Sequence, residues 1–412
     1  MVTDRDFITD TRKEFISRLK ENGVYLIFSG TPKSLTMDDD YRFFADVNFR
    51  YLTGLDNENM IYAVRKTDND CQEMIFAPEK DPIKERWHGA RMSPEEIREL
   101  TGISQILDRE DFASWLVDRT SCGETVFADL TSVTKEVENL QSMAGQKIKD
   151  ISKILTDMRL IKSPYEIGCI EEAAKITEEA IDAVKGYIRE GMTEYDVYTR
   201  LEYEIARRSD PTFAFATIVA IDRNSFCLHH GRPDKDLKIS WDGYIQIDCG
   251  ARVNGYCADI SRVIFTGGPA PEEDPSDKRY VLHGIIRALR KEAKEFIKPG
   301  VTFEELNILM KTRLFEMLKD TDLAEEGEDP LEVAKKYYWH NTSHFLGLNV
   351  HDVGGRDKKF EEGMTLAVEP GVYIPEWNVG FRIEDDVLVT KNGCRYLSSG
   401  KDDIGEAYIC IR

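Results

Sequence analysis

Two aspartates stand on either side of a predicted hairpin turn. The stretch DCGARVNGYCAD runs from Asp248 to Asp259 between two apolar runs, YIQI before it and ISRVIF after it. Asn254 and Gly255 form the strongest short signal for a two-residue turn, which places Asp248 opposite Ser261. Asp259 is then the diagonal neighbour of Asp248, with about 7 Å or less between their Cβ atoms. The two carboxylates should converge, and they repel each other unless a cation lies between them.

Histidines and glutamates gather in a few further segments. Two glutamates, Glu369 in LAVEPGVYI and Glu384 in GFRIEDDVLV, stand in apolar, strand-like runs. A salt bridge from Arg252 or Arg262 is one explanation of the aspartate pair that needs no metal ion. For the histidines the corresponding alternative is a structural role, which is the usual role of a lone histidine. Clustering of the histidines among glycines favours a ligand role instead. Five of the seven lie in CLHHGRP and HNTSHFLGLNVHDVGG, at His229, His230, His340, His344 and His351.

Four carboxylates and one neutral imidazole form a set whose four negative charges match two divalent cations. Such a set suits Mn²⁺ and similar hard to borderline ions better than a thiolate-type zinc site. Two ions about 3.5 to 4 Å apart can hold a bridging water and lower its pKa toward neutrality. The chemistry indicated is metal-assisted hydrolysis. The set comprises Asp248, Asp259, His344, Glu369 and Glu384.

The elements that must position these residues fall into two domains, as expected for a chain of 412 residues. In the first, residues 11–23 predict an amphipathic helix, and residues 24–30, 49–55 and 60–66 predict strands, so an α/β layer structure is expected. We place the border just before residue 156, which gives domains 1–155 and 156–412. A long helix begins soon afterwards, because Ser163, Pro164 and Glu166 form a helix start with a capping box.

The second domain contains a repeated pattern. The stretches IREGMTEYDVYTRLEYEI from Ile188 and IKPGVTFEELNILMKTRL from Ile297 share a helix end, a glycine, a capping threonine and an amphipathic helix, at an offset of 109 residues. One explanation is two similar halves related by a pseudo-twofold axis, with a site between them. The other is that the pattern is simply how helices stop and restart.

Composition excludes several classes of protein. The net charge of −21 argues against a nucleic-acid-binding protein, because such proteins need a basic surface to bind the phosphates. The amino terminus has no apolar core like that of a signal peptide, and no run approaches membrane-spanning length, so a cytoplasmic protein without a membrane partner is expected. The eight cysteines are scattered without a CxxC pair and are expected to be reduced, buried thiols.

These residues resemble the pita-bread metallopeptidases, and specifically the aminopeptidase P group. The matching stretches are IDCGARVNGYCADISR, HNTSHFLGLNVHDVGG, VEPGVYI and FRIEDD, in the family's order and with its spacing of eleven residues between the aspartates. The resemblance implies an α/β (α+β) catalytic domain of two pseudo-symmetric halves around two metal ions. It implies that the five residues named above are the ligands, with Mn²⁺ favoured and Co²⁺ or Zn²⁺ as alternatives. One departure is Val263, where the family usually has threonine.

Further roles follow from the same resemblance. Glu369 would also take a proton from the bridging water as general base. His229 matches the histidine that closes over the substrate, His351 the residue that steadies the tetrahedral intermediate, and His340 one that lines the pocket near the product proline. Arg382 matches an arginine bonded to the metal-ligand shell, either as a catalytic group or as a support for the ligands.

The resemblance extends to the first domain through YRFFADVNFRYLTGLDN and ERWHGARMSPEE and so covers nearly the whole chain. It implies a homo-oligomer, a dimer or tetramer, in which this smaller α/β domain contributes to subunit contacts and to the rim of a neighbouring active site. Trp87 is a candidate for that rim, and a buried aromatic is the alternative.

The function that the resemblance implies is a metal-dependent aminopeptidase. It would hydrolyse the bond between an N-terminal residue and a penultimate proline by means of a metal-bridged hydroxide, and its partners would be peptides with proline in second position. The close alternative is an Xaa-Pro dipeptidase, prolidase, which shares both domains and all five ligands. The alternative from another class is a catalytically inactive pita-bread binding module, which loss of ligand residues would mark.

Overall fold

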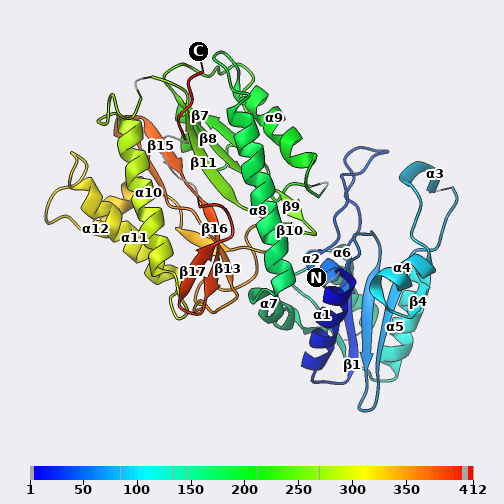
Figure 1. The fold of residues 1–412 in the computed structure, drawn as a ribbon. Coiled ribbons are helices and arrows are strands. Elements are labelled where there is room, and N and C mark those ends of the chain that lie inside the picture. The colour runs from blue at the N-terminus through cyan, green and yellow to red at the C-terminus, as the bar shows by residue number, and fades with distance from the viewer. Residues whose placement is uncertain are drawn as a thin grey trace. The chain divides into compact units, whose positions relative to one another are not determined.

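The computed structural model describes residues 4–83, 85–132, 134–145, 147–210, 212–268, 270–400 and 407–411 (Figure 1). The chain divides into two compact units, Met1–Met158 and Arg159–Arg412. The division falls inside helix α7 (Ser152–Leu160), close to the border expected from the sequence.

The first unit is built on one mixed six-stranded sheet with the order β4-β3-β2-β1-β5-β6. The central pairs β1–β2 and β2–β3 are antiparallel, and the outer pairs β1–β5, β3–β4 and β5–β6 are parallel. The α/β class expected for this part of the chain is confirmed. The strands are β1 Gly23–Phe28, β2 Ile61–Lys66, β3 Cys71–Ala77, β4 Gln105–Asp108, β5 Val126–Ala128 and β6 Lys149–Asp150; the helices are α1 Asp4–Arg18, α2 Val47–Thr53, α3 Glu85–His88, α4 Pro94–Thr101, α5 Phe112–Ser121 and α6 Lys135–Ala144.

The strand predicted for residues 49–55 is wrong, because these residues form most of helix α2. The Asp46 side chain accepts hydrogen bonds from the backbone N–H groups of Asn48 and Phe49, which caps the helix start. Gly54 ends the helix in the left-handed conformation, at a φ of 69°. Capping at both ends therefore outweighs the β propensity of the aromatic residues between them.

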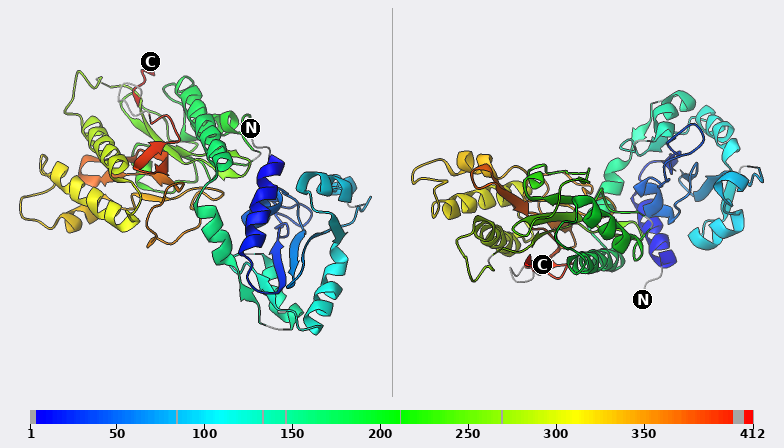
Figure 2. Two further views of the ribbon diagram at one scale, coloured as in Figure 1. Left: turned by 60° about the horizontal axis from the view of Figure 1, so that its bottom comes forward. Right: turned by 90° about the horizontal axis from the view of Figure 1, so that it is seen from above.

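The second unit has two larger sheets, β11-β8-β7 and β12-β13-β16-β17, and two hairpins, β9–β10 and β14–β15. Helices α8 and α10 lie on one side of the strands, in front of them in Figure 1 and below them in the view from above in Figure 2. The helices are α8 Pro164–Lys185, α9 Glu194–Ala206, α10 Lys278–Phe296, α11 Phe303–Leu318 and α12 Pro330–Tyr337. The strands are β7 Ile218–Ile221, β8 Tyr244–Cys249, β9 Arg252–Val253, β10 Tyr256–Cys257, β11 Ile260–Phe265, β12 Ser343–Phe345, β13 Thr365–Val368, β14 Gly371–Ile374, β15 Val379–Arg382, β16 Asp385–Thr390 and β17 Gly393–Tyr396.

The two repeated stretches occupy equivalent places in this unit. Thr193 caps α9 through a capping box with Asp196, and Thr302 caps α11 through a capping box with Glu305. In each half a pair of helices precedes the strands of one sheet, α8 and α9 before β7, β8 and β11, and α10 and α11 before β12, β13, β16 and β17, with the additional helix α12 inserted in the second half. The succession agrees with the fold of two similar halves.

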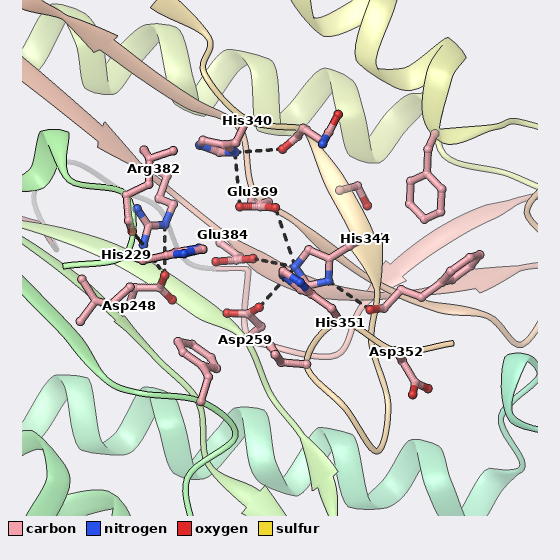
Figure 3. Close-up of a pocket in the computed structure, with 18 of the residues that line it drawn as sticks. His229, Asp248, Asp259, His340, His344, His351, Asp352, Glu369, Arg382 and Glu384 are labelled. Carbon is pink, nitrogen blue, oxygen red and sulfur yellow. Dashed lines mark hydrogen bonds and ion pairs between the residues drawn. The ribbon is translucent and has the colours of Figure 1, made fainter. Parts of the chain in front are cut away.

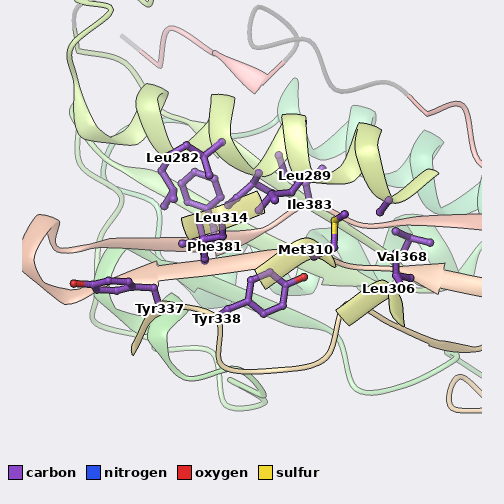
Figure 4. Close-up of a cluster of buried hydrophobic side chains, with 14 of the residues drawn as sticks. Leu282, Leu289, Leu306, Met310, Leu314, Tyr337, Tyr338, Val368, Phe381 and Ile383 are labelled. Atoms are coloured by element: carbon purple, nitrogen blue, oxygen red, sulfur yellow. The ribbon is translucent and has the colours of Figure 1, made fainter. Parts of the chain in front are cut away.

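Helix α11 anchors the strands that lead into the predicted site (Figure 4). Its residues Leu306, Met310 and Leu314 recur at every fourth position and are fully buried. Burying each such side chain contributes about 1.5 to 3 kcal/mol to stability. They belong to one apolar cluster with residues from α10 and from the strand segments next to Glu369 and Glu384, among them Leu282, Leu289, Val368, Phe381 and Ile383.

Two expectations about exposure require correction. Trp87 is 82% exposed, so the alternative that it is a buried aromatic is wrong. All eight cysteines are free, but Cys71, Cys122, Cys227 and Cys410 are exposed, so burial holds for only part of the set. Among the residues that the structure describes, no helix is both long and apolar enough to cross a membrane.

Candidate metal centre

The predicted hairpin places the two aspartates as expected, although its ladder is interrupted. β8 pairs antiparallel with β11, with Asp248 opposite Ser261. The turn residues Asn254 and Gly255 both have positive φ, 50° and 88°, which two-residue hairpin turns of this kind require. The ladder breaks at Gly250, where a Cβ atom would lie 1.9 Å from a backbone carbonyl oxygen of the opposite chain segment. The interruption leaves Asp259 just outside β11, where its side chain is free to turn toward the second half.

His344 stands at the centre of the converging carboxylates. Its Nε2 lies 3.4 Å from Asp259 Oδ2, 3.8 Å from Glu369 Oε1 and 3.9 Å from Glu384 Oε1 (Figure 3). Its Nδ1 lies 3.0 Å from the carbonyl oxygen of Phe345, to which it donates as N–H. The hydrogen bond to this carbonyl fixes the tautomer in which Nε2 carries the lone pair and is available to a cation.

Asp248 is held by Arg382, the arginine that the resemblance placed at the metal-ligand shell, and not by Arg252 or Arg262. Arg382 Nε donates to Asp248 Oδ2 at 3.1 Å, and Arg382 Nη2 also contacts that oxygen. Arg382 Nη2 further donates to the carbonyl oxygen of Leu228 at 3.1 Å. Arg262 lies 2.7 Å from Asp385. The second oxygen of Asp248 is thus left to face the cavity.

The donor atoms of this cluster fit divalent cations. Asp248 Oδ1 and Glu384 Oε1 are buried without a hydrogen-bond partner, which is costly for a carboxylate. Burial, and next the neighbouring Asp248, raise the pKa of Asp259 well above its usual range, and burial and next Asp259 do the same for Glu384. Burial also raises the pKa of Glu369 to about 7. Three buried carboxylates, the partly buried Glu369 and one imidazole nitrogen are a ligand set that a pair of divalent ions would complete.

The strands of the two halves are bonded to each other at the ligands. Glu384 N donates to Ser261 O at 3.1 Å, and Asp259 N donates to Asp386 Oδ2 at 3.1 Å. Arg262 Nη1 donates to the carbonyl oxygen of Glu384 at 2.5 Å. The backbone on both sides of the cluster is therefore fixed by the protein itself.

His340 is oriented by three neighbours. Its Nδ1 donates to Asn341 O at 2.9 Å and lies 3.4 Å from Glu369 Oε2, and its Nε2 accepts from the Tyr373 hydroxyl at 3.2 Å. Burial lowers the pKa of His340 to about 4, so the ring is neutral at pH 7. Gly371 allows this arrangement, because a Cβ atom there would lie 2.4 Å from His340 Nε2.

The adjacent histidines His229 and His230 point to different surroundings. His229 lines the cavity, whereas His230 Nε2 lies 2.8 Å from Glu194 Oε2. Glu194 also accepts from the backbone N–H of Ile221 at 2.7 Å and of Asp234 at 2.7 Å. The buried Glu194 carboxylate therefore anchors the segment that carries His229.

The five ligand candidates and the four further site residues, His229, His340, His351 and Arg382, all line one cavity of about 660 Å³. His351 is among them, with its ring centre 4.2 Å from that of His344, and burial, then His344, lowers its pKa. The sequence did not identify the apolar residues of the cavity wall, because apolar residues of this kind are equally typical of ordinary buried positions. These residues include Phe215, Ala216, Ile218, Leu228, Phe303 and Val350.

Two other residues could not have been found from the sequence alone. Glu194 reads as an ordinary acidic residue in the first turn of a helix, and its bonds to residues 27 to 40 positions later carry no local signal. Tyr373 lies within the stretch VEPGVYI, but its hydroxyl contact with His340 depends on tertiary packing.

Comparisons with known proteins agree with this geometry. The model of metallopeptidase family M24 matches residues 168–391, and that of the aminopeptidase P N-terminal domain matches residues 8–127. A Xaa-Pro aminopeptidase from Haemophilus influenzae is 29% identical over 95% of this chain and 93% of its own, and a Xaa-Pro dipeptidase from Pyrococcus furiosus is 32% identical over 68% and 75%. A solved structure of a putative aminopeptidase P from Bacillus anthracis superposes with a TM-score of 0.89 at 30% identity, covering 98% of this chain and 97% of that one.

Proposed function

Because the chain belongs to metallopeptidase family M24, we propose that it removes the N-terminal residue from peptides whose second residue is proline. The convergence of three carboxylates on His344 Nε2 inside one cavity carries this proposal. The length of the match to Xaa-Pro aminopeptidases supports it, since both units of the chain are covered. An X-Pro bond is a tertiary amide without an N–H group, so a pocket shaped for the proline ring must provide the selectivity.

We propose that Asp248, Asp259, His344, Glu369 and Glu384 bind two divalent ions, with Mn²⁺ favoured and Co²⁺ or Zn²⁺ as alternatives. The unpartnered buried oxygens and the raised pKa values support the assignment. When bound, such ions supply charge stabilisation and a water of lowered pKa.

The side chains around this centre have separate roles in catalysis. Glu369, whose carboxylate faces the same cavity, would accept the proton of the attacking water on a carboxylate oxygen. His351 and His229, which line the same cavity, donate N–H groups to the substrate carbonyl and to the developing oxyanion. His340, kept neutral by burial, orients Glu369 and lines the side where the product proline leaves.

Arg382 is a positioning residue in this scheme. It bonds Asp248 and the carbonyl oxygen of Leu228 with the same guanidinium, so it ties a metal ligand to the segment that carries His229. The fixed fork of an arginine suits this task, which a lysine would not fulfil.

The proposal extends to the parts of the chain outside the centre. Residues 1–155 are assigned as an aminopeptidase P-type domain and residues 156–412 as the catalytic domain, supported by the two matched family models. We further propose that the protein forms a homo-oligomer, either a dimer or a tetramer, and that it is located in the cytoplasm. Free thiols, four of them exposed, suit a reducing compartment.

Two alternatives remain to be distinguished. A dipeptidase activity is less supported, because the similar dipeptidase matches only 68% of this chain. An inactive binding module conflicts with the presence of all five ligand residues.

Turnover of a Gly-Pro dipeptide and a Gly-Pro-Ala tripeptide with added Mn²⁺ tests the proposal. Cleavage of the tripeptide is expected, with release of free glycine. Glu369→Gln should lower kcat by about 100-fold or more, whereas Glu361→Gln, the same change at an exposed site of the same segment, should not. Cleavage of the dipeptide alone would assign a dipeptidase, and less than about one divalent ion per subunit by elemental analysis would refute the two-metal centre.

A further inference from the structure

A second cavity of about 540 Å³ lies beside the active-site cavity, between α11 and α12. Phe303 and Arg356 line both cavities, so the second continues from the mouth of the first. We call it the α11–α12 groove, and its walls on the two helices include Asn307, Ile308, Lys311, Leu331 and Lys335.

Hydrogen bonds and ring contacts fix the groove to the metal centre. Asn307 Nδ2 donates to Asn341 Oδ1 at 2.7 Å, and Asn341 lines the active-site cavity. Asn307 Oδ1 accepts from Thr342 N and from Thr342 Oγ1, both at 2.9 Å. Phe303 packs edge to face against Phe345, with ring centres 4.8 Å apart. Since Phe345 directly follows His344, the groove has a fixed place relative to the reacting bond.

The groove presents apolar surface together with cations. Ile308 is 47% exposed and Leu331 is 37% exposed, which is high for large apolar side chains. Three cations, Lys311, Lys335 and Arg356, and two acidic residues line it. Lys335 Nζ also lies 2.5 Å from Glu332 Oε1, but both side chains are about two-thirds exposed, and such exposed pairs are weak, so a peptide carboxylate can exchange with Glu332. The groove is therefore close to neutral in a chain with a net charge of −21, and a carboxylate meets less repulsion there than the net charge of the chain implies.

We propose that the α11–α12 groove binds the part of a peptide substrate that follows the penultimate proline, and that Lys311 and Lys335 hold a carboxylate of that part. The inference rests on the proposed function, because an aminopeptidase must lead the rest of its substrate out of the cavity. An extended chain advances by about 3.3 Å per residue, so the third and later residues are those that leave the mouth. The apolar side chains Ile308 and Leu331 accommodate residues between the proline and the carboxylate.

The carboxylate can come from an acidic side chain or from the peptide's carboxyl terminus, and four peptides distinguish them. Ala-Pro-Ala amide is too short to place a charge in the groove, and Ala-Pro-Ala-Ala-Ala amide is long but uncharged. The free acid of the longer peptide tests the terminal carboxylate, and Ala-Pro-Ala-Asp-Ala amide tests the side chain. We expect at least one charged peptide to have a kcat/KM about fivefold above that of the long amide, through KM, and the advantage to shrink in high salt.

The double variant Lys311→Met and Lys335→Met should abolish this advantage and leave cleavage of Ala-Pro-Ala amide unchanged. Lys336→Met is the matched control, because Lys336 lies on the same helix, is 57% exposed and stands outside the groove. Equal kcat/KM for charged and uncharged long peptides, or an advantage that survives in the double variant, would overturn the proposal. In either case continued cleavage of the short amide leaves the proposed function standing, whereas failure to cleave the short amide would refute that function itself.

Discussion

Removal of divalent ions should make the protein lose stability as the pH rises, and Glu369→Gln should recover part of the loss. Burial raises the pKa of Glu369 from 4.5 to about 7. Above pH 4.5 the unfolded chain releases this proton, whereas the folded protein keeps it until about pH 7. The contribution of Glu369 to the free energy of unfolding is therefore fully present below pH 4.5 and is lost as the pH rises through about 7. Asp259 and Glu384, whose pKa values burial also raises, act in the same direction.

The size of the effect follows from the shift of this one carboxyl group. The difference between a pKa of 4.5 in the unfolded chain and of about 7 in the folded protein corresponds to a loss of about 3 kcal/mol in the free energy of unfolding above pH 7. The Glu369 side chain is only 18% exposed, so solvent screening reduces this figure little. For a unit of this size a loss of about 3 kcal/mol lowers the melting temperature by about 6 to 12 °C.

Thermal unfolding of chelator-treated protein at pH 5 and pH 8 measures the effect. Metal-free Glu369→Gln should melt close to the metal-free wild type at pH 5 and above it at pH 8, because the amide has no proton to lose. Added Mn²⁺ should restore the wild type at pH 8, since the ions compensate the ionised carboxylates. Glu361→Gln, at an exposed site, should follow the wild type throughout. The reasoning is refuted if the difference between wild type and Glu369→Gln is the same at both pH values.

Three further variants probe the contacts around the centre. Glu194→Gln weakens the anchor of the segment that carries His229 and should raise KM by about tenfold, with metal content unchanged in elemental analysis. Gly371→Ala places a methyl group against His340 and should lower kcat/KM while the metal stays bound. Asp385→Asn removes the carboxylate that pairs with the buried Arg290 and with the partly buried Arg262, and it should destabilise the metal-loaded protein by about 3 to 5 kcal/mol in urea unfolding.

Local signals explain what the sequence predicted correctly. The turn at Asn254 and Gly255 requires positive φ at both positions, and few residue pairs allow that, so the register of Asp248 followed from the turn alone. The helix starts at Thr193 and Thr302 were equally predictable, because a capping box is complete within four residues. The metal-ligand candidates followed from residue type combined with these registers and with the resemblance.

Features that depend on distant contacts were missed. The sequence of helix α2 predicts a strand, since its aromatic residues have β propensity, whereas the Asp46 cap makes it a helix. The partner of Asp248 is Arg382, which is 134 residues away in the sequence. Only the resemblance pointed to this arginine, whereas the candidates offered by the hairpin itself, Arg252 and Arg262, were close neighbours. Sequence proximity is a poor guide to ion pairs because the two halves of a domain meet only in the folded state.

Each half of the second unit contributes an incomplete set of candidate ligands. Asp248 and Asp259 come from the first half, and His344, Glu369 and Glu384 from the second. The bonds that join the halves occur at these residues, as in the pairing of the Glu384 backbone with Ser261 at 3.1 Å. The donor atoms of Asp259, His344 and Glu384 consequently lie within 4.8 Å of one another. The fold thus holds the candidate ligands close together, and the repulsion between their carboxylates destabilises the metal-free protein. Bound cations would attract carboxylates from both halves and so stabilise the contact between the halves.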